Sequence, residues 1–272
     1  MKKTKRSSVK KVGSVENEKS DKSPKVYQKN KIKVDLHIAE RDDFTEKQKE
    51  LIEIILNKKN SVIFIKGPSG TSKTFVSIYA ALHLLNKKYI SDLVYVRSIA
   101  ESASKSLGSL PGNFEEKMDP FLMPLEEKLD ELLPKPEVDL LKKEDRIQGF
   151  PVNYLRGASI NAKCVIVDEA QNLTFQELTT VITRIGKYAT FIILGDPMQS
   201  DINGKSGFMK MFDLFDEPSS SDEGIKCFTF GREDVVRSGI LKHILDRIEG
   251  TYNPISAIEK KDIEAIKKEP MF

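Results

Sequence analysis

The stretch GPSGTSKT, residues 67–74, has the residue types of a loop that binds phosphate groups. Such loops follow the pattern G-x-x-x-x-G-K-[ST], and their backbone N–H groups surround the phosphates at the start of a helix. Lys73 would reach the β- and γ-phosphates, and the Thr74 hydroxyl would bind Mg²⁺. Alone, the stretch also fits a glycine-rich turn beside a surface lysine. The candidate nucleotide-binding residues here are Gly67, Pro68, Ser69, Gly70, Thr71, Ser72, Lys73 and Thr74.

One position of this loop departs from the pattern, because Ser72 stands where glycine is usual. We expect the position to need a backbone N–H and a small side chain, and serine supplies both. Gly67 and Gly70 are the positions where we expect the turn to need conformational freedom. The serine is therefore predicted to be a tolerated variant.

Two adjacent carboxylates, Asp168 and Glu169, follow four apolar residues about ninety positions after the loop. A carboxylate at the end of a strand can hold Mg²⁺ through water, and its neighbour can act as general base toward an attacking water. Acidic residues also suit the first turn of a helix. Their place after both the loop and a predicted buried strand favours Asp168 as the metal ligand and Glu169 as the base.

Four further side chains carry weaker signals. Gln199, three residues after Asp196, could contact the γ-phosphate or orient a water molecule. Arg232 and Arg237 lie near the start of a predicted helix, where one of them could stabilise charge in phosphoryl transfer. Gln48, upstream of the loop, could hydrogen-bond the edge of adenine. Each also fits an ordinary polar surface residue.

The predicted secondary structure places these side chains at the ends of strands. Runs of β-branched and aromatic residues predict five buried strands, within 61–65, 92–98, 163–171, 188–201 and 225–230. Apolar residues at helical spacing predict helices over 43–60, 73–88, 114–133, 174–186, 203–215 and 232–250. Thr45 with Gln48, and Thr174 with Glu177, have the spacing of a helix-capping box. Pro120 and Pro124 are expected to interrupt the third helix, and the segment 216–224 is expected to be a surface loop. The segment 134–162 shows no clear pattern.

Strands that alternate with helices predict an α/β fold, with a mostly parallel sheet of about five strands and helices on both faces. In such sheets ligands bind at the carboxyl ends of the strands. The polar motifs fall at these ends, so the sequence predicts one site there.

Composition restricts the class of protein. The chain has 272 residues, 39% hydrophobic and 31% charged, and no apolar run approaches the roughly 18 residues that cross a membrane. Two distant cysteines argue against a disulfide framework and a zinc site, and fit a cytoplasmic location. Residues 1–33 hold twelve basic and three acidic side chains, a net charge of +9 in a chain of +3. This segment is predicted to be a disordered tail that serves solubility or non-specific nucleic-acid contact.

Taken in order, the motifs resemble those of the PhoH-like ATPases. The resemblance covers about residues 40–250, and implies an ATPase domain over 34–250 with the basic tail 1–33 before it and an extension 251–272 after it. That family is similar to the first RecA-like domain of superfamily 1 helicases, so a RecA-like P-loop fold is implied. The resemblance rests on the stretches GPSGTSKT, SLGSLPGNFEEKMDPFLMPL, YLRGASINAKCVIVDEAQNLT, LGDPMQSD and DVVRSGI.

The resemblance also implies roles residue by residue. Gln48 matches the glutamine that reads adenine, and Lys73 and Thr74 match the phosphate loop. Gln199 matches a γ-phosphate sensor, and Arg237 matches the arginine of the DVVR stretch, with Arg232 a weaker candidate. Asp168 and Glu169 match the metal-binding aspartate and the catalytic glutamate. ATP and Mg²⁺ are the implied cofactors.

Three functions remain open from the sequence. The first is Mg²⁺-dependent ATP hydrolysis. The second is an ATP-driven motor that remodels RNA or single-stranded DNA, with Arg97, Lys105 and Arg156 as candidate strand contacts. The third is a switch in which bound ATP controls assembly without hydrolysis. A kinase is less favoured than these three, because no acceptor site is evident. The family resemblance implies a homo-oligomer, with a ring as one form. If the protein is a two-lobed motor, its second lobe would come from another subunit.

Overall fold

The computed structural model describes residues 35–97, 114–155, 159–202 and 204–236, together with residues 240, 243, 244 and 247. The predicted tail 1–33 and extension 251–272 lie outside these residues, as do Lys105, Arg156 and Arg237. Of the helix predicted over 232–250, residues 232–236 form turn and irregular structure instead, whereas the four separate residues 240, 243, 244 and 247 are helical.

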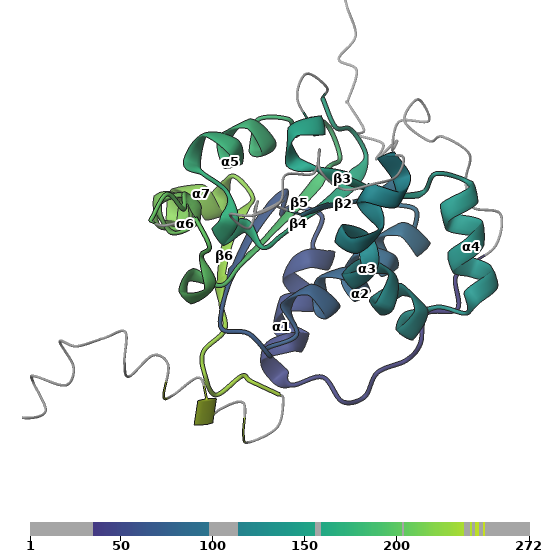
Figure 1. The fold of residues 1–272 in the computed structure, drawn as a ribbon, viewed down its shortest axis with the longest axis horizontal. Helices are drawn as coiled ribbons and strands as arrows, with labels where there is room; N and C mark the ends of the chain where they lie inside the picture. The colour runs from purple at the N-terminus through teal and green to yellow at the C-terminus, as the bar shows by residue number, and fades with distance from the viewer. Residues whose placement is uncertain are drawn as a thin grey trace, which may run out of the picture.

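The centre of the fold is a six-stranded sheet in the order β3-β2-β4-β5-β1-β6, and all of its strand pairs are parallel (Figure 1). This confirms the predicted α/β fold class, a parallel sheet with helices on both faces. The sheet has one strand more than expected, because β3 lies in the segment that showed no pattern. The strands are β1 (Val62–Lys66), β2 (Asp92–Arg97), β3 (Ile147–Pro151), β4 (Lys163–Asp168), β5 (Thr190–Gly195) and β6 (Ile225–Thr229).

Alternate residues of each central strand face opposite sides of the sheet, and each side has its own apolar core. On β4, Cys164 and Ile166 belong to one core, whereas Val165 and Val167 belong to the other. All four side chains are fully buried. Both faces are therefore covered, which is why these strands read as continuous apolar runs rather than as alternating ones.

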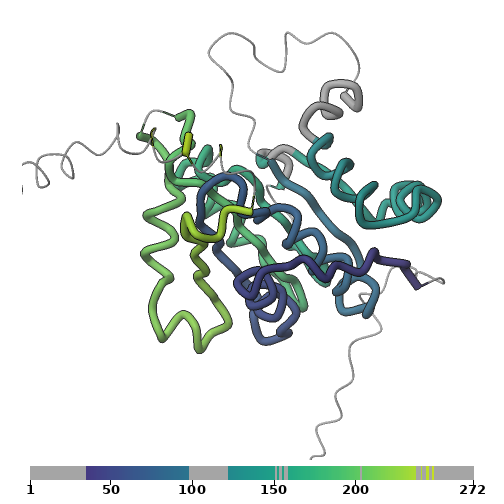
Figure 2. The backbone as a smooth tube through the Cα atoms, turned by 90° about the horizontal axis from the view of Figure 1, so that it is seen from below, coloured from purple at the N-terminus to yellow at the C-terminus, as the bar shows by residue number. Residues whose placement is uncertain are grey.

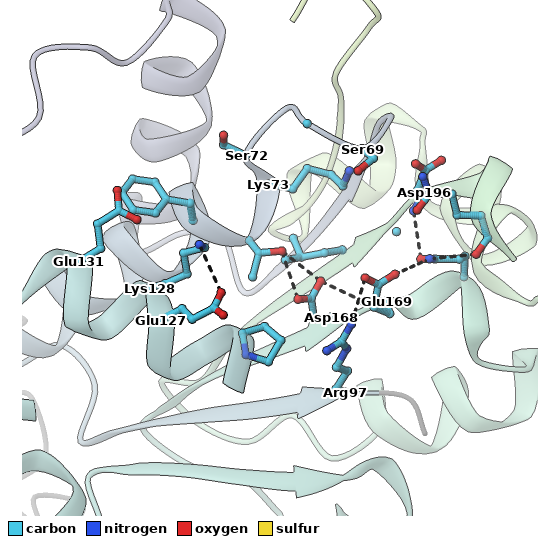
Figure 3. A pocket seen from close by; sticks show the side chains of 18 of the residues that line it. Ser69, Ser72, Lys73, Arg97, Glu127, Lys128, Glu131, Asp168, Glu169 and Asp196 are labelled. Atoms are coloured by element: carbon cyan, nitrogen blue, oxygen red, sulfur yellow. Dashed lines mark hydrogen bonds and ion pairs between the residues drawn. The ribbon is translucent and has the colours of Figure 1, made fainter. Parts of the chain in front are cut away.

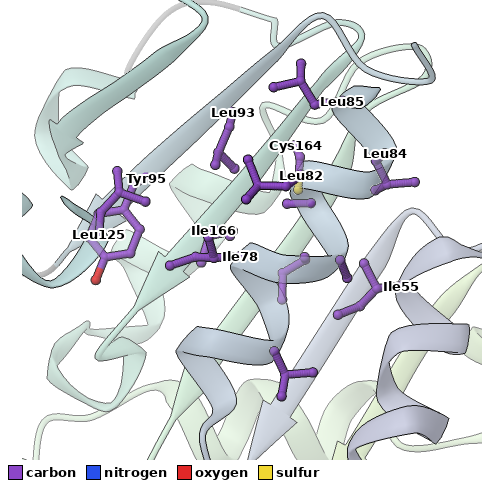
Figure 4. Packing of buried hydrophobic residues seen from close by; sticks show 14 of the residues in the cluster. Ile55, Ile78, Leu82, Leu84, Leu85, Leu93, Tyr95, Leu125, Cys164 and Ile166 are labelled. Atoms are coloured by element: carbon purple, nitrogen blue, oxygen red, sulfur yellow. The ribbon is translucent and has the colours of Figure 1, made fainter. Parts of the chain in front are cut away.

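The first core lies under four helices that come before β3 in the chain (Figures 1 and 4). They are α1 (Glu46–Leu56), α2 (Lys73–Asn86), α3 (Phe114–Leu132) and α4 (Lys135–Lys143). Buried residues of all four pack with β1, β2, β4 and β5, as Ile55, Leu82 and Leu125 illustrate. The capping box predicted for α1 is present, since Thr45 accepts from the Gln48 backbone and Gln48 from that of Thr45.

The second core lies under helices of the later half of the chain, α5 (Phe175–Ile182) and α6 (Phe208–Phe215), which Figure 2 shows in green on the side of the molecule away from the teal α3 and α4. Leu178, Val181 and Phe212 are fully buried against the sheet. The short helix α7 (Pro218–Asp222) lies beside α6 and leads into β6 (Figure 1). The surface loop expected over 216–224 is thus partly helical, because Pro218 occupies the first helical position, where a missing N–H costs nothing.

The expected interruption of α3 is wrong, since one helix runs from Phe114 to Leu132 through both prolines. A proline inside a helix removes one backbone hydrogen bond and bends the helix. Leu125, Leu129 and Leu132, spaced by four and three residues, are fully or almost fully buried on one face. Their packing against the sheet holds the helix in spite of the prolines.

A buried ionic cluster joins three strands at the amino end of the sheet, opposite the predicted site. Arg146 Nε lies 3.1 Å from one carboxylate oxygen of Asp92, and Lys163 Nζ lies 3.1 Å from the other. Arg146 also donates to the Ser91 carbonyl at 2.6 Å. Asp92 and Arg146 are only 3% and 5% exposed, so the two ions compensate each other out of contact with water.

Within the described residues, no helix combines the length and the apolar character that crossing a bilayer requires.

Candidate functional site

The predicted phosphate loop connects the carboxyl end of β1, which lies between β5 and the edge strand β6, to the first residue of α2. Gly70 has a φ of 88°, as expected for a position that needs conformational freedom. Gly67 is required for a different reason than expected. A Cβ at Gly67 would lie 2.6 Å from the Cβ of Phe230, so this glycine allows the loop to pass close to the chain that follows β6.

Ser72, not Gly67, is the second position of the loop with left-handed backbone angles, a φ of 62° and a ψ of 27°. Its side chain makes no capping hydrogen bond to α2. The usual pattern has glycine at this position because the loop requires left-handed backbone angles here, which glycine adopts without strain. The serine meets this need at a cost of about 1–2 kcal/mol, the strain of a non-glycine residue in this region.

Replacing Ser72 with glycine is expected to raise the free energy of unfolding by up to about 1 kcal/mol. The substitution removes the left-handed strain but adds about 0.4–1 kcal/mol of chain entropy to the unfolded state. Urea denaturation measures the difference. Ser69→Gly in the same loop is the matched control, because Ser69 has no positive φ and should only lose stability. Equal effects of the two substitutions would contradict strain at Ser72.

The side chain of Lys73 lies folded over the loop. Its Nζ donates to the carbonyls of Gly67 at 2.7 Å and of Pro68 at 2.9 Å. Burial lowers the pKa of the Lys73 ammonium, and the nearby carboxylates of Asp196, Asp168 and Glu169 oppose this shift. The ammonium is thus weakly solvated at the place where the pattern predicts the β- and γ-phosphates.

Asp168 ends β4 beside the loop, as predicted, and it contacts Thr74 directly. Thr74 Oγ1 lies 3.2 Å and 3.1 Å from the two carboxylate oxygens of Asp168. A third residue, which the motifs did not reveal, completes the arrangement. The hydroxyl of Tyr95 on β2 donates to Asp168 Oδ2 at 2.6 Å. Burial and the neighbouring Asp168 both raise the pKa of the Tyr95 phenol, so it remains a donor.

Glu169 turns out of the strand with a left-handed φ of 55° and brings its carboxylate to the same edge of the sheet. Its Oε1 lies 3.5 Å from Arg97 Nη2, at the end of β2. Its Oε2 accepts from Gln171 Nε2 at 2.6 Å. Non-glycine residues with such backbone angles cluster at functional sites, where the surrounding structure holds them.

Gln171 is a second residue that the sequence analysis missed, and it connects the two polar turns. Besides Glu169, its Nε2 contacts the Gln199 carbonyl at 3.3 Å. Its Oε1 accepts from the Asp196 backbone N–H at 3.0 Å. The only available signal was its position two residues after Glu169 in the DEAQ stretch. Gln199 is exposed at the edge of the site, in the turn η5 (Pro197–Gln199).

These residues surround a cavity of about 400 Å³, within the usual range for small-molecule sites (Figure 3). Eight of the predicted site residues line it, namely Ser69, Gly70, Ser72, Lys73, Thr74, Asp168, Glu169 and Gln199. Gly67, Pro68 and Thr71 are not among its lining residues, and of these Thr71 is fully buried in the loop. Arg97 also lines the cavity, together with Gln171 and Asp196, and its contact with nucleic acid stays a prediction.

The remaining predicted residues lie elsewhere. Gln48 is buried behind the loop, where its Nε2 donates to the Thr71 carbonyl at 3.3 Å. Its role in reading adenine stays a prediction. Arg232 is exposed and is not among the residues lining the cavity. Arg237 lies outside the described residues. The residue before it, Val236, donates its N–H to the Gly70 carbonyl at 3.1 Å, so Val236 contacts the loop.

One wall of the cavity was not predicted at all. It is formed by residues of α3, three of which Figure 3 labels, by a side chain from the segment before α1 and by one from the first turn of α2. No motif pointed to it, because its residues come from three segments that only the fold brings together. Its members are Arg41, Phe75, Pro124, Glu127, Lys128 and Glu131.

Comparison with known proteins places the chain in a family. The family model described as PhoH-like protein matches residues 42–249. The PhoH-like protein of Synechocystis sp. is 34% identical over 211 residues, which cover 77% of this chain and 62% of the relative. The PhoH-like protein of Bacillus subtilis is 33% identical over 189 residues, covering 70% and 58%. Protein PhoH of Escherichia coli K12 is 30% identical over 192 residues, covering 69% and 53%.

The matched part is therefore less than two thirds of the length of each of these relatives. Among solved structures, the S. cerevisiae Hsp104–ADP complex is similar over 78% of this chain and 37% of its own, with a TM-score of 0.32 and 13% identity. A likeness of this size does not bear on fold or function. The match to the family model, over most of the sheet and every motif of the site, shows that this chain belongs to the PhoH-like protein family.

Proposed function

We propose that this protein binds ATP together with Mg²⁺ and hydrolyses it to ADP and phosphate. Family and fold support nucleotide binding or hydrolysis in general. The observation that carries the more specific proposal is the contact between the loop and the end of β4. Thr74 lies within hydrogen-bond distance of Asp168, and the next residue, Glu169, lines the same cavity.

The donor set fits Mg²⁺. The Thr74 hydroxyl and the Asp168 carboxylate are hard oxygen donors. Thr74 Oγ1 lies 3.2 Å from Asp168 Oδ1 and 3.1 Å from Asp168 Oδ2. Mg²⁺ is usually held by one or two carboxylates, water and substrate phosphates rather than by a cage of protein ligands. When bound, the ion would neutralise charge on the phosphates.

The proposed roles of the other side chains follow from their positions. Lys73 would leave the loop carbonyls and bind the β- and γ-phosphates. Glu169 would take a proton from the attacking water, which Gln199 would help to orient. Gln171 would hold the Glu169 carboxylate in place through the 2.6 Å hydrogen bond from its Nε2 to Glu169 Oε2. An arginine, with Arg237 the first candidate, would stabilise the charge that develops during transfer.

The test of this function is a phosphate-release assay under multiple turnover, with EDTA in place of Mg²⁺ as the control. Several phosphates released per chain, dependent on Mg²⁺, would support the proposal. A single phosphate or none per chain, with ATP bound, would contradict it and support the assembly switch. Analysis of the products distinguishes hydrolysis from transfer to another acceptor.

One observation favours the motor that remodels RNA or single-stranded DNA as a second candidate. Arg97 lies at the carboxyl end of β2 and is 3.5 Å from Glu169, so a nucleic-acid phosphate that attracted Arg97 would change the surroundings of the base. Phosphate release that is unchanged by single-stranded RNA and DNA, at low and at physiological salt, would contradict this candidate. The native mass in the same buffers tests the expected homo-oligomer.

Tyr95→Phe is expected to raise the Mg²⁺ concentration needed for half-maximal ATP binding by about tenfold. The tyrosine orients the Asp168 carboxylate, and loss of such outer-shell partners costs roughly 10–100-fold in metal affinity. The change preserves the ring, so the fold should remain intact. A Mg²⁺ titration of ATP binding measures the effect, with binding in EDTA unaffected. The matched control is Tyr89→Phe, at a tyrosine that is 41% exposed, and an equal Mg²⁺ requirement in all three proteins would contradict the role.

A further inference from the structure

The cavity extends well beyond the phosphate loop, and its far wall is made by α3. Figure 3 shows Glu127, Lys128 and Glu131 on one side of Lys73, and Asp196 on the other. Lys73, Thr74 and the carboxylates at the strand ends account for the phosphates and the metal in the proposed function. The wall at α3 has no role in that chemistry, so it is free to contact another part of the ligand.

Arg41 is the most firmly held side chain of this wall. Its Nε and Nη2 donate to the two carboxylate oxygens of Asp43 at 2.9 Å and 2.8 Å. Its Nη1 donates to Glu131 on α3 at 2.8 Å. All three nitrogens are engaged, and hydrogen bonds from a guanidinium leave in its own plane. The guanidinium is thus held in a fixed plane, and these hydrogen bonds do not occupy its faces.

Phe75 lies on one of these faces. The Cζ of Arg41 is 5.0 Å from the centre of the Phe75 ring, within the range of a cation–π contact. Phe44 supports the same ring, with 6.1 Å between the ring centres. Phe75 directly follows Thr74, so this aromatic group lies one residue from the proposed Mg²⁺ ligand. Both Arg41 and Phe75 line the cavity.

We propose that Arg41 and Phe75 form the platform on which the base of the nucleotide stacks, with Glu131 as the residue that positions Arg41. The proposal rests on the proposed function in that the phosphates of the same ligand occupy the loop. A base is a flat aromatic ring, and aromatic rings and guanidinium planes are the surfaces on which bases stack. The ligand class is therefore a nucleoside triphosphate whose base contributes to affinity.

The charges around Arg41 argue against an anion as its ligand. Asp43 and Glu131 already pair with the guanidinium, and each would repel a phosphate that approached it. Glu127 adds a third carboxylate to this wall, with Lys128 4.0 Å away. What this wall offers to a ligand is thus mainly flat surface. A purely structural role for Arg41, which would tie α3 to the segment before α1, is the alternative that the test must separate.

The experiment compares the binding of Mg·ATP with that of inorganic tripolyphosphate, which lacks the base, to the full chain by calorimetry. We expect Arg41→Lys to weaken ATP binding on the order of tenfold, because stacking on one base contributes about 1–3 kcal/mol and tenfold is 1.4 kcal/mol. Lysine keeps the charge and loses the plane. Tripolyphosphate should bind equally to both proteins. Glu131→Gln, which loosens Arg41, should weaken ATP in the same selective way.

Asp130→Asn is the matched control, since Asp130 precedes Glu131 and pairs with Lys135 rather than with Arg41. It should change neither affinity. Equal weakening of ATP and tripolyphosphate by Arg41→Lys would overturn the platform, as would wild-type binding of ATP no tighter than that of tripolyphosphate. Selective loss of ATP affinity in a protein that releases no phosphate would support the platform and contradict the hydrolysis proposal alone.

Discussion

Glu169→Gln is expected to lower the rate of phosphate release by about 10²–10⁴-fold, the usual contribution of a general base, while ATP remains bound. Glutamine has nearly the shape of glutamate but cannot accept a proton. Its amide oxygen can still accept from Gln171 Nε2, as Glu169 Oε2 does at 2.6 Å. The substitution thus removes the proton acceptor and the charge that faces Arg97, but keeps the hydrogen bond to Gln171 and does not alter the phosphate loop.

Multiple-turnover phosphate release and ATP binding, measured on the same preparation, separate the two effects. The matched control is Glu177→Gln. Glu177 forms the capping box of α5 with Thr174, where glutamine serves equally well, and it is not among the residues lining the cavity. Phosphate release at the wild-type rate from Glu169→Gln would remove this residue from the role of base. A loss of ATP binding by the same factor would assign Glu169 to ligand binding instead.

The largest expected effect on stability is at the amino end of the sheet. Asp92→Ala should lower the free energy of unfolding by about 3–5 kcal/mol, as for removal of one partner from a buried ion pair. Asp92 is 3% exposed and lies 3.1 Å from both Arg146 Nε and Lys163 Nζ. Without it, the buried guanidinium of Arg146 loses its compensating carboxylate.

Urea denaturation of both proteins measures this loss. Asp139→Ala is the control, because Asp139 pairs with Lys135 on the surface of α4 at 3.4 Å with both side chains more than half exposed. Surface pairs of this kind contribute about 0–1 kcal/mol. If Asp92→Ala were no more destabilising than Asp139→Ala, the cluster would not hold β2, β3 and β4 together as its burial indicates.

Much of the fold could be predicted from the sequence, because the patterns that indicate its strands and helices are local. The strands β1, β4 and β5 are continuous apolar runs, and the capping boxes at Thr45 and Thr174 mark helix starts that the structure confirms. The strand β3 was not readable. Its sequence, IQGFP, contains glycine and proline, and it forms a strand by pairing with β2 at the edge of the sheet. Edge strands tolerate such residues.

The continuity of α3 is a second feature that local sequence patterns did not predict. Its two prolines predicted breaks, because the rule for proline considers only the helix itself. The leucines that anchor the helix act through the sheet beneath it, and that contact is not local in sequence. Tertiary packing therefore outweighed the local preference.

By itself, the sequence determined which groups can meet a phosphate. The loop of residues 67–74, Asp168 and Glu169 have the right types and follow strands, and parallel strands place their carboxyl ends at one edge of the sheet. Only the tertiary structure decided how these groups are held. The hydrogen bonds from Tyr95 to Asp168 and from Arg41 to Glu131 join segments far apart in the chain. Such contacts form only when the chain is folded, so no local sequence pattern predicts them.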